Sequence, residues 1–260
     1  MAIDLRARLR ALGLHTTADG LDDLIDLGTK KRWSLEQLFE AVADREEKER
    51  ARKGLERRMT RSRIGRFKPI ADYDWAWPTS IARDRVESAV RLDFLQAARN
   101  VVLVAPQGLG KTMIAQNIAN EAVLQGHSVI FITAAQLLLD LAAQESARTL
   151  ERRFRHYAKT SLLILDEVGY LAFDNRNADL LFQVVTRRYE RKSLVLTTNL
   201  AFKDWPTVFP NATCATALID RVIHHADVIA IKGKSYRLRE AEALALADDE
   251  PARAAKAKKG

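Results

Sequence analysis

An octapeptide with two glycines and a Lys-Thr ending constrains the fold of this chain more than any other feature. It reads Ala105-Pro106-Gln107-Gly108-Leu109-Gly110-Lys111-Thr112, and it lies between an apolar run, 101–105, and a helical pattern, 113–124. Glycines let backbone N–H groups turn inward around an anion, and the following helix adds the positive potential of its amino end. A strand, such a loop and a helix in this order predict a phosphate-binding loop.

The residue types of this loop assign separate tasks to its members. Lys111 is expected to reach the β- and γ-phosphates of a nucleotide, and Thr112 is expected to hold Mg²⁺. Ala105 occupies the position where the usual pattern has its first glycine, and alanine fits there if its φ is negative. The residues predicted to bind the nucleotide in this segment are Gln107, Gly108, Leu109, Gly110, Lys111, Thr112 and Met113.

Short apolar runs alternate with helical stretches from residue 101 onward, which is typical of a parallel sheet covered by helices on both faces. Five strands are expected in this α/β region, and a further helix is expected at about 80–99 ahead of the first. The expected strands span residues 101–105, 128–133, 162–166, 194–198 and 227–231.

Polar residues follow two of these strands at their carboxyl ends, where open α/β sheets bind ligands. Asp166 and Glu167 come after four apolar residues, 162–165. Asp166 is expected to hold Mg²⁺, and Glu167 is expected to activate the attacking water. Asn199 ends the strand 194–198 and is a candidate for positioning that water, although Asn in this place is more often a turn residue.

An amphipathic helix is expected over 217–225, ahead of the last strand. Arg221 in this helix is a candidate arginine finger that reaches the γ-phosphate of a neighbouring subunit. His224 and His225 are adjacent in it, so we expect them to point to different faces of the helix and not to share a metal.

Charge is distributed unevenly along the chain. The net charge of the 260 residues is +8, but residues 71–250 have a net charge of −1, and the excess lies in residues 1–70 (+5) and 251–260 (+4). Within the first part, residues 45–68 contain 11 Lys or Arg and four Glu. Basic segments of this kind favour a nucleic-acid partner over plain solubility.

Three segments are therefore expected. Residues 1–68 form a basic helical domain, 69–246 form the phosphate-loop domain, and 247–260 form a disordered basic tail. Tyr73, Trp75 and Trp77 alternate at the start of the second segment, and packing of this connector onto the domain is favoured over base stacking. Only about 60 residues follow Asn199, which is too few for a last strand and a full C-terminal helical lid.

Composition excludes other classes of protein. No apolar run approaches the roughly 20 residues of a membrane helix, and no apolar segment of signal-peptide type follows the arginines near the start of the chain. One cysteine, Cys214, excludes an internal disulfide framework. We therefore expect a cytoplasmic protein with no membrane partner.

Several motifs together resemble the IstB family. The resemblance covers residues 5–242 and includes the helical front end and the loop at 105–112. The remaining motifs are Asp166-Glu167-Val168-Gly169, Thr198-Asn199-Leu200, Asp220-Arg221-Val222-Ile223-His224-His225 and Lys232-Gly233-Lys234-Ser235-Tyr236-Arg237-Leu238-Arg239.

The resemblance implies a P-loop NTPase of the AAA+ class, similar to the DnaC helicase loaders, that binds ATP with Mg²⁺ and hydrolyses it. It implies a homo-oligomer that assembles on DNA, which we expect to be duplex, and that recruits or activates a cognate transposase of an insertion sequence. By the same resemblance Asn199 corresponds to sensor 1, Arg221 to the arginine finger and Arg237, as a further nucleotide-binding residue, to sensor 2.

Three alternatives remain open. A replicative helicase loader, acting in DNA replication, would prefer single-stranded DNA. A small-molecule kinase would need a lid and an acceptor pocket, and a DNA-binding module that uses ATP only as a switch would not need Glu167. Two further groups of basic residues either face DNA or are solvated helix faces, namely Arg148, Arg152, Arg153, Arg155 and Lys159, and Arg187, Arg188, Arg191 and Lys192.

Overall fold

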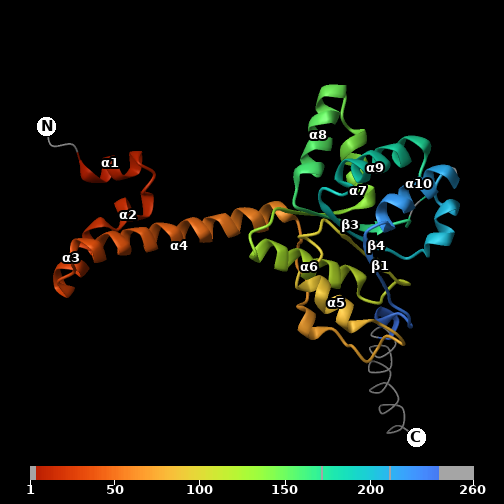
Figure 1. Ribbon diagram of the computed structural model, residues 1–260, viewed down its shortest axis with the longest axis horizontal. Helices are drawn as coiled ribbons and strands as arrows, with labels where there is room; N and C mark the ends of the chain where they lie inside the picture. Colours follow the sequence, from red (N-terminus) through yellow and green to blue (C-terminus); the bar gives the residue numbers. More distant parts are fainter. Residues whose placement is uncertain (1–3, 171, 211, 240–260) are drawn as a thin grey trace, which may run out of the picture. The chain divides into compact units, whose positions relative to one another are not determined.

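The computed structural model describes residues 4–170, 172–210 and 212–239, so the tail predicted at 247–260 lies outside the described residues. The chain divides into two compact units, one ending at Thr60 and the other beginning at Arg61. The first is helical, and the second is an α/β domain (Figure 1).

The helical unit is built from three short helices and most of a long one, α4. Ser34 and Gln37 form a capping box at the start of α4: the Ser34 N–H donates to Gln37 Oε1 (2.9 Å), and the Gln37 N–H donates to Ser34 Oγ (3.2 Å). A small core includes Ala18 and Leu24, and the buried Glu46 accepts the N–H of Thr17 at 2.7 Å. The helices are α1 (Leu5–Ala11), α2 (His15–Asp19), α3 (Leu21–Lys31) and α4 (Leu35–Ser62).

The second unit begins eight residues before the boundary expected from the sequence at 68/69. The segment 61–68 packs on helix α6 (Lys111–Leu124). Ile64 is buried, the Gln116 amide donates to its carbonyl at 3.0 Å, and the Asn117 amide donates to the carbonyl of Lys68 at 3.0 Å. These contacts place the basic segment 61–68 with the α/β domain.

The five predicted strands form one parallel sheet in the order β2-β3-β4-β1-β5. Each strand begins within one residue of its expected start, and β3 continues two residues beyond its expected end. The carboxyl ends of β1, β3 and β4 therefore meet at the centre of one edge. The strands are β1 (Asn100–Val104), β2 (Val129–Thr133), β3 (Leu162–Val168), β4 (Ser193–Thr198) and β5 (Ala226–Ala230).

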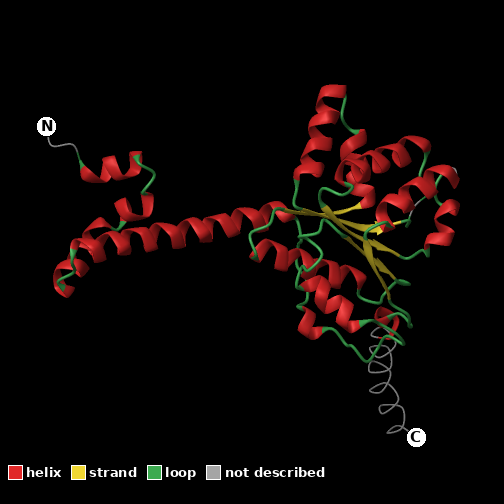
Figure 2. Cartoon of the chain, in the orientation of Figure 1, coloured by secondary structure: helices red, strands yellow, loops and turns green. Residues whose placement is uncertain are grey.

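Helices cover both faces of the sheet, as predicted (Figures 1 and 2). Alternate residues of a strand point to opposite faces, so Leu163 and Leu165 of β3 pack in the core beneath the second helical layer. One layer contains α5 (Arg83–Val90) and α6, and the other contains α7 (Ala134–Ala142), α8 (Ala147–Lys159), α9 (Asn175–Arg188) and α10 (Ala212–Ile223).

The prediction of a helix over 80–99 was wrong in the length of the helix. Helix α5 ends at Val90, and turns follow as far as β1. Leu92 (φ 68°) and Ala98 (φ 49°) adopt left-handed backbone conformations, which interrupt a right-handed helix. The apolar pattern continues through this segment because Leu92 and Phe94 are buried. Within the described residues, the structure contains no helix with the length and apolar character needed to cross a membrane.

Candidate nucleotide-binding site

The predicted phosphate-binding loop joins β1 to α6 and needs both of its glycines. Gly108 (φ 76°) and Gly110 (φ 81°) adopt the left-handed region that side chains disfavour. A Cβ at Gly108 would lie 2.1 Å from Oγ of Ser235, and one at Gly110 would lie 2.5 Å from Cε2 of Tyr73. Ala105, at the position of the usual first glycine, is not among the positive-φ residues, so alanine fits there. The loop is thus compact and closely covered.

Lys111 begins helix α6 and folds its ammonium back over the loop. Its Nζ donates to the carbonyls of Ala105 (2.7 Å) and Pro106 (2.9 Å). Burial lowers the pKa of this group, while the Asp166 carboxylate opposes that shift. The cation is held by neutral carbonyls and is well placed to exchange them for the oxygens of an anion.

Thr112 and Asp166 bring two oxygen ligands together at the carboxyl end of β3. Thr112 Oγ1 donates to Asp166 Oδ2 at 3.0 Å, and the carboxylate is buried. A hydroxyl and a carboxylate beside a phosphate-binding loop match the oxygen ligands that Mg²⁺ prefers. This pair therefore fits the ion that the sequence predicts.

Glu167 is held in a strained backbone conformation beside that pair. Its φ is 62°, and the pairing of β3 with β4 shifts register between Leu165 and Val168. A left-handed non-glycine residue costs of order 1–3 kcal/mol and persists only where its surroundings enforce it. The carboxylate is exposed and lines the cavity described below.

Thr197, which the sequence analysis did not select, connects the Asp166 carboxylate to the backbone of Glu167. This buried residue of β4 donates its hydroxyl to Asp166 Oδ1 at 2.5 Å and accepts the N–H of Glu167 at 3.0 Å. It therefore fixes both the ligand for the cation and the backbone of Glu167. The sequence signal that could have identified Thr197 is its position one residue before the end of β4, the strand next to β3.

A cavity of about 510 Å³ opens over the loop and collects most of the predicted residues. Asp166 and Arg221 do not line the cavity. Asp166 is hydrogen-bonded to Thr112, which does. Arg221 instead donates to the Ala217 carbonyl (3.1 Å) and stacks its guanidinium 4.5 Å from the ring centre of Phe182. The predicted residues in the lining are Gln107, Gly108, Leu109, Gly110, Lys111, Thr112, Met113, Glu167, Asn199 and Arg237.

The connector before α5 supplies one wall of this cavity. Tyr73 is buried and donates its hydroxyl to the Leu109 carbonyl at 3.0 Å, and burial raises its pKa to about 12, so the phenol is neutral at pH 7. Trp75 packs on Tyr73 with ring centroids 4.8 Å apart. Turns hold Trp75 and Trp77 in this connector, which packs onto the domain as expected.

The chain after β5 supplies a further part of the wall, next to the connector. The Tyr236 N–H donates to the Gly108 carbonyl at 2.9 Å, and the Lys234 carbonyl accepts the indole N–H of Trp77 at 2.9 Å. Arg237 is exposed at the rim of the cavity, seven residues after β5. The last described residues, 236–239, are helical.

Comparison with known proteins agrees with this architecture. The model of the IstB-like ATP binding protein family matches residues 7–243. A protein of insertion sequence IS232 from Bacillus thuringiensis subsp. berliner is 34% identical over 91% of this chain and 94% of its own length. A protein of insertion sequence IS21 from Pseudomonas aeruginosa is 32% identical over 91% of this chain and 89% of its own. Both relatives are named for ATP binding.

Two solved structures share the fold of the α/β domain. The crystal structure of DnaI has a TM-score of 0.52 at 20% identity and covers 66% of this chain and 91% of its own. Domain III of the Thermotoga maritima replication initiation protein DnaA has a TM-score of 0.51 at 18% identity, covering 64% and 69%. The fold and the phosphate-binding loop thus define a P-loop domain of the AAA+ class. Within that class, the chain belongs to the family of IstB-like ATP binding proteins.

Proposed function

We propose that this chain is an ATPase that assembles as a homo-oligomer on duplex DNA and recruits or activates a transposase. The observation that carries the enzymatic part is the arrangement of Lys111, Thr112 and Glu167 around one cavity, with Asp166 hydrogen-bonded to Thr112. Thr197 holds the Asp166 carboxylate and the backbone of Glu167. The relatives' names, which place them in insertion sequences, support the link to transposition.

The side chains divide the work of hydrolysis among them. Lys111 and the loop N–H groups bind the β- and γ-phosphates of ATP. Thr112 and Asp166 would hold Mg²⁺, which would neutralise phosphate charge. Glu167 takes the proton of the attacking water, and Asn199 at the same cavity orients that water. Arg237, at the cavity rim, is placed to contact the nucleotide as it binds.

Arg221 gives a reason for assembly. Unlike Lys111, Glu167 and Asn199, it lies outside the lining of its own cavity. A finger supplied by a neighbouring subunit stabilises the charge of the transition state and makes hydrolysis depend on contact between subunits. We propose that Arg221 acts on the nucleotide of the next subunit.

Mixing two inactive variants tests this role in trans. We expect Arg221→Ala and Glu167→Gln each to be inactive, and an equimolar mixture of the two to recover activity. In a random mixture about a quarter of the interfaces join an intact Glu167 to an intact finger. The measurement is phosphate release, with assembly followed by size-exclusion chromatography coupled to light scattering.

The matched control mixes Glu167→Gln with Lys111→Ala, because both changes damage the site on the same side of the interface. This mixture should stay inactive. An Arg221→Ala mixture that assembles but recovers no activity would exclude a finger in trans.

Two basic surfaces support the assignment of DNA as partner. In α4 and the residues after it, Glu56 is the last acid: residues 57–68 contain six Lys or Arg and no Asp or Glu. Earlier in the helix, by contrast, Arg52 pairs with Glu49 and Glu56. The net charge assigned to 45–68 is therefore concentrated at its end, where phosphates would meet the fewest carboxylates.

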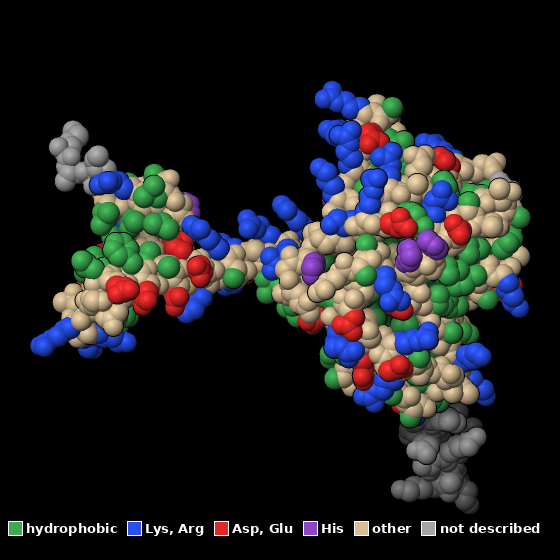
Figure 3. Space-filling view, in the orientation of Figure 1, with side chains coloured by type: hydrophobic (Ala, Val, Ile, Leu, Met, Phe, Trp, Pro, Cys, Tyr) green, Lys and Arg blue, Asp and Glu red, His purple; other side chains and the backbone are tan. Residues whose placement is uncertain are grey.

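Helix α8 presents the second basic surface. Its exposed cations Arg148, Arg152, Arg155 and Lys159 recur at intervals of three and four residues, which places them on one face. Figure 3 shows basic side chains gathered over this helix. Arg155 on this face also pairs with Glu151 at 3.1 Å, and Arg153, from the same predicted group, pairs with Asp140.

Arg188 lies neither on a DNA-facing surface nor on a solvated helix face, so both interpretations of the sequence were wrong for this residue. It is buried and donates to the carbonyls of Tyr157 (2.6 Å), Thr160 (2.8 Å) and Ser161 (3.3 Å). Burial lowers its pKa to about 9. Its role is structural, because it donates hydrogen bonds to backbone carbonyls at the carboxyl end of α8.

The salt dependence of DNA affinity tests the role of the 57–68 segment. Each phosphate neutralised on duplex DNA contributes a log–log slope of about −0.9. Removing four cations should flatten the slope by up to about 3.6 units and weaken all sequences alike, since phosphate contacts carry no base identity. The quadruple variant replaces Arg57, Arg58, Arg61 and Arg63 with Ala, and its affinity for duplex DNA is measured by fluorescence anisotropy at several salt concentrations.

The matched control removes the same charge elsewhere, by replacing Arg8, Lys30, Lys31 and Arg32 with Ala, and should keep the wild-type slope. An unchanged slope in the first variant would assign this segment to protein recognition. Tighter binding to single-stranded than to duplex DNA would favour the helicase-loader alternative over the transposition role.

A further inference from the structure

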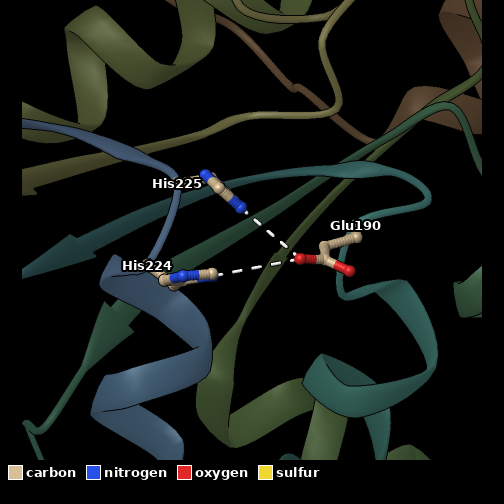
Figure 4. A group of neighbouring side chains, drawn as sticks. All are labelled: Glu190, His224 and His225. Carbon is tan, nitrogen blue, oxygen red and sulfur yellow. Dashed lines mark ion pairs between the residues drawn. The ribbon is translucent and has the colours of Figure 1, made fainter.

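Glu190, His224 and His225 form a cluster at the opposite end of the sheet from the nucleotide cavity (Figure 4). Glu190 precedes β4, and the two histidines precede β5, so all three lie at the amino ends of strands. The cavity over the phosphate-binding loop lies at the carboxyl ends. The cluster is therefore separate from the ATP site and has no part in the proposed hydrolysis.

The sequence-based expectation that the two histidines point apart was wrong, because helix α10 ends at Ile223. His224 and His225 lie in the turn that follows it, where helical geometry no longer separates neighbouring side chains. Their ring centroids lie 4.1 Å apart. Both rings reach toward the same carboxylate (Figure 4).

The distances suit a metal ion. One ligand atom from each residue lies within 4.8 Å of the others. Glu190 Oε1 lies 3.4 Å from His225 Nε2 and 3.9 Å from His224 Nδ1. In a tetrahedral site with bonds near 2.0–2.1 Å, neighbouring ligand atoms are about 3.3 Å apart. A small inward shift of the side chains therefore produces that geometry.

The backbone around each ligand is fixed. Glu190 adopts a left-handed conformation (φ 56°) in a turn where the N–H groups of Arg191 and Lys192 both donate to the Arg188 carbonyl at 2.9 Å. The His225 carbonyl accepts the N–H of Asn100 at 2.8 Å, which ties it to the start of β1. Rigid backbone lowers the ordering cost of binding.

Tyr189 adds a polar neighbour, because its hydroxyl lies 2.6 Å from His224 Nδ1. Nδ1 is also the His224 atom that faces Glu190, so this hydrogen bond opens when Nδ1 binds an ion, and the freed hydroxyl offers a further oxygen beside the site. The three ligands are about half exposed, with side-chain exposures of 50–54%, so an ion reaches them from solvent.

We propose that Glu190, His224 and His225 form a binding site for a divalent transition metal of the Zn²⁺ type. Two imidazoles and a carboxylate suit Zn²⁺, Co²⁺ or Ni²⁺, whereas Mg²⁺ prefers oxygen ligands alone. A bound ion ties the turn after α9 to the end of α10, the helix that carries Arg221. The ion thereby braces the helical layer from which the finger projects.

The test uses the full chain freed of metal by dialysis against a chelator, without ATP. Zn²⁺ is titrated by isothermal calorimetry, and Co²⁺ is titrated in parallel because its visible absorption reports tetrahedral ligands. We expect one ion per chain with micromolar affinity, and a rise in Tm with Zn²⁺, since a ligand that binds only the folded state stabilises it. His225→Ala and Glu190→Gln should each weaken binding at least about tenfold.

The matched control removes two histidines elsewhere, His15→Ala with His127→Ala, and should retain wild-type affinity. Absence of stoichiometric binding in the wild type would overturn the proposal. The proposal would also be overturned if the affinity for Zn²⁺ fell in the His15→Ala, His127→Ala control but not in His225→Ala. A lowered Tm of Glu190→Gln together with no Zn²⁺ binding by the wild type would show that the cluster is a charge pair only.

Discussion

Lys111→Ala should lower the affinity for ATP by at least about 100-fold, or about 3 kcal/mol, because it removes the charge-assisted hydrogen bonds of the one loop cation to the phosphates. Lys111 Nζ reaches the loop carbonyls of Ala105 and Pro106, so its position above the phosphate site is set by the loop itself. The measurement is calorimetric titration with ATP and Mg²⁺.

The fold should survive this change. Burial lowers the pKa of Lys111, which means that the folded chain disfavours its charge. Removing the ammonium therefore gives up little stability, and Tm and the far-UV circular dichroism spectrum should stay close to wild type. Lys203→Ala, outside the cavity lining, is the control for a lost lysine. Unchanged ATP affinity in folded Lys111→Ala would refute the assignment of the phosphate-binding loop.

The sequence predicted those parts of the fold and site that are encoded locally. The strands β1 to β4 appeared as apolar runs because both of their faces are largely buried. Gly108, Gly110, Lys111 and Thr112 were found because they lie within five residues. Asp166 and Glu167 were found because the carboxyl ends of parallel strands share one edge of the sheet.

Contacts between distant segments could not be predicted in the same way. Tyr73 reaches Leu109 and Trp77 reaches Lys234, which are separated by 36 and 157 positions, and no local pattern marks either pair. Arg188 has the same local signature as a solvated arginine, yet its carbonyl partners come from another helix end. Tertiary structure, not residue type, decides the role of such side chains.

Helix ends produced the other differences. The left-handed residue Leu92 ended α5 early, and the stop of α10 at Ile223 released His224 and His225 from helical spacing. Neither position carries glycine or proline, the residues that mark a helix end most clearly in a sequence. Such ends are set by packing and are therefore the least predictable features of a single sequence.

Glu167→Gln is expected to bind ATP normally and to hydrolyse it at least about 100-fold more slowly, because a general base contributes about 10²- to 10⁴-fold to such a reaction. Gln keeps the shape of Glu but cannot accept the proton of the attacking water. The backbone N–H of residue 167 still donates to Thr197 Oγ1, so the left-handed conformation and the Asp166 contact are retained. Phosphate release in single-turnover assays measures the loss.

The ATP-bound form of this variant should persist, and DNA-bound oligomers should accumulate in electrophoretic mobility assays with duplex DNA, since the population follows the state that ATP stabilises. Glu145→Gln, an exposed change outside the cavity, is the matched control and should turn over ATP at the wild-type rate. Wild-type hydrolysis by Glu167→Gln would exclude Glu167 as the base. If the variant lost hydrolysis but did not accumulate on DNA, Glu167 would still be the base, and release from DNA would not depend on ATP hydrolysis.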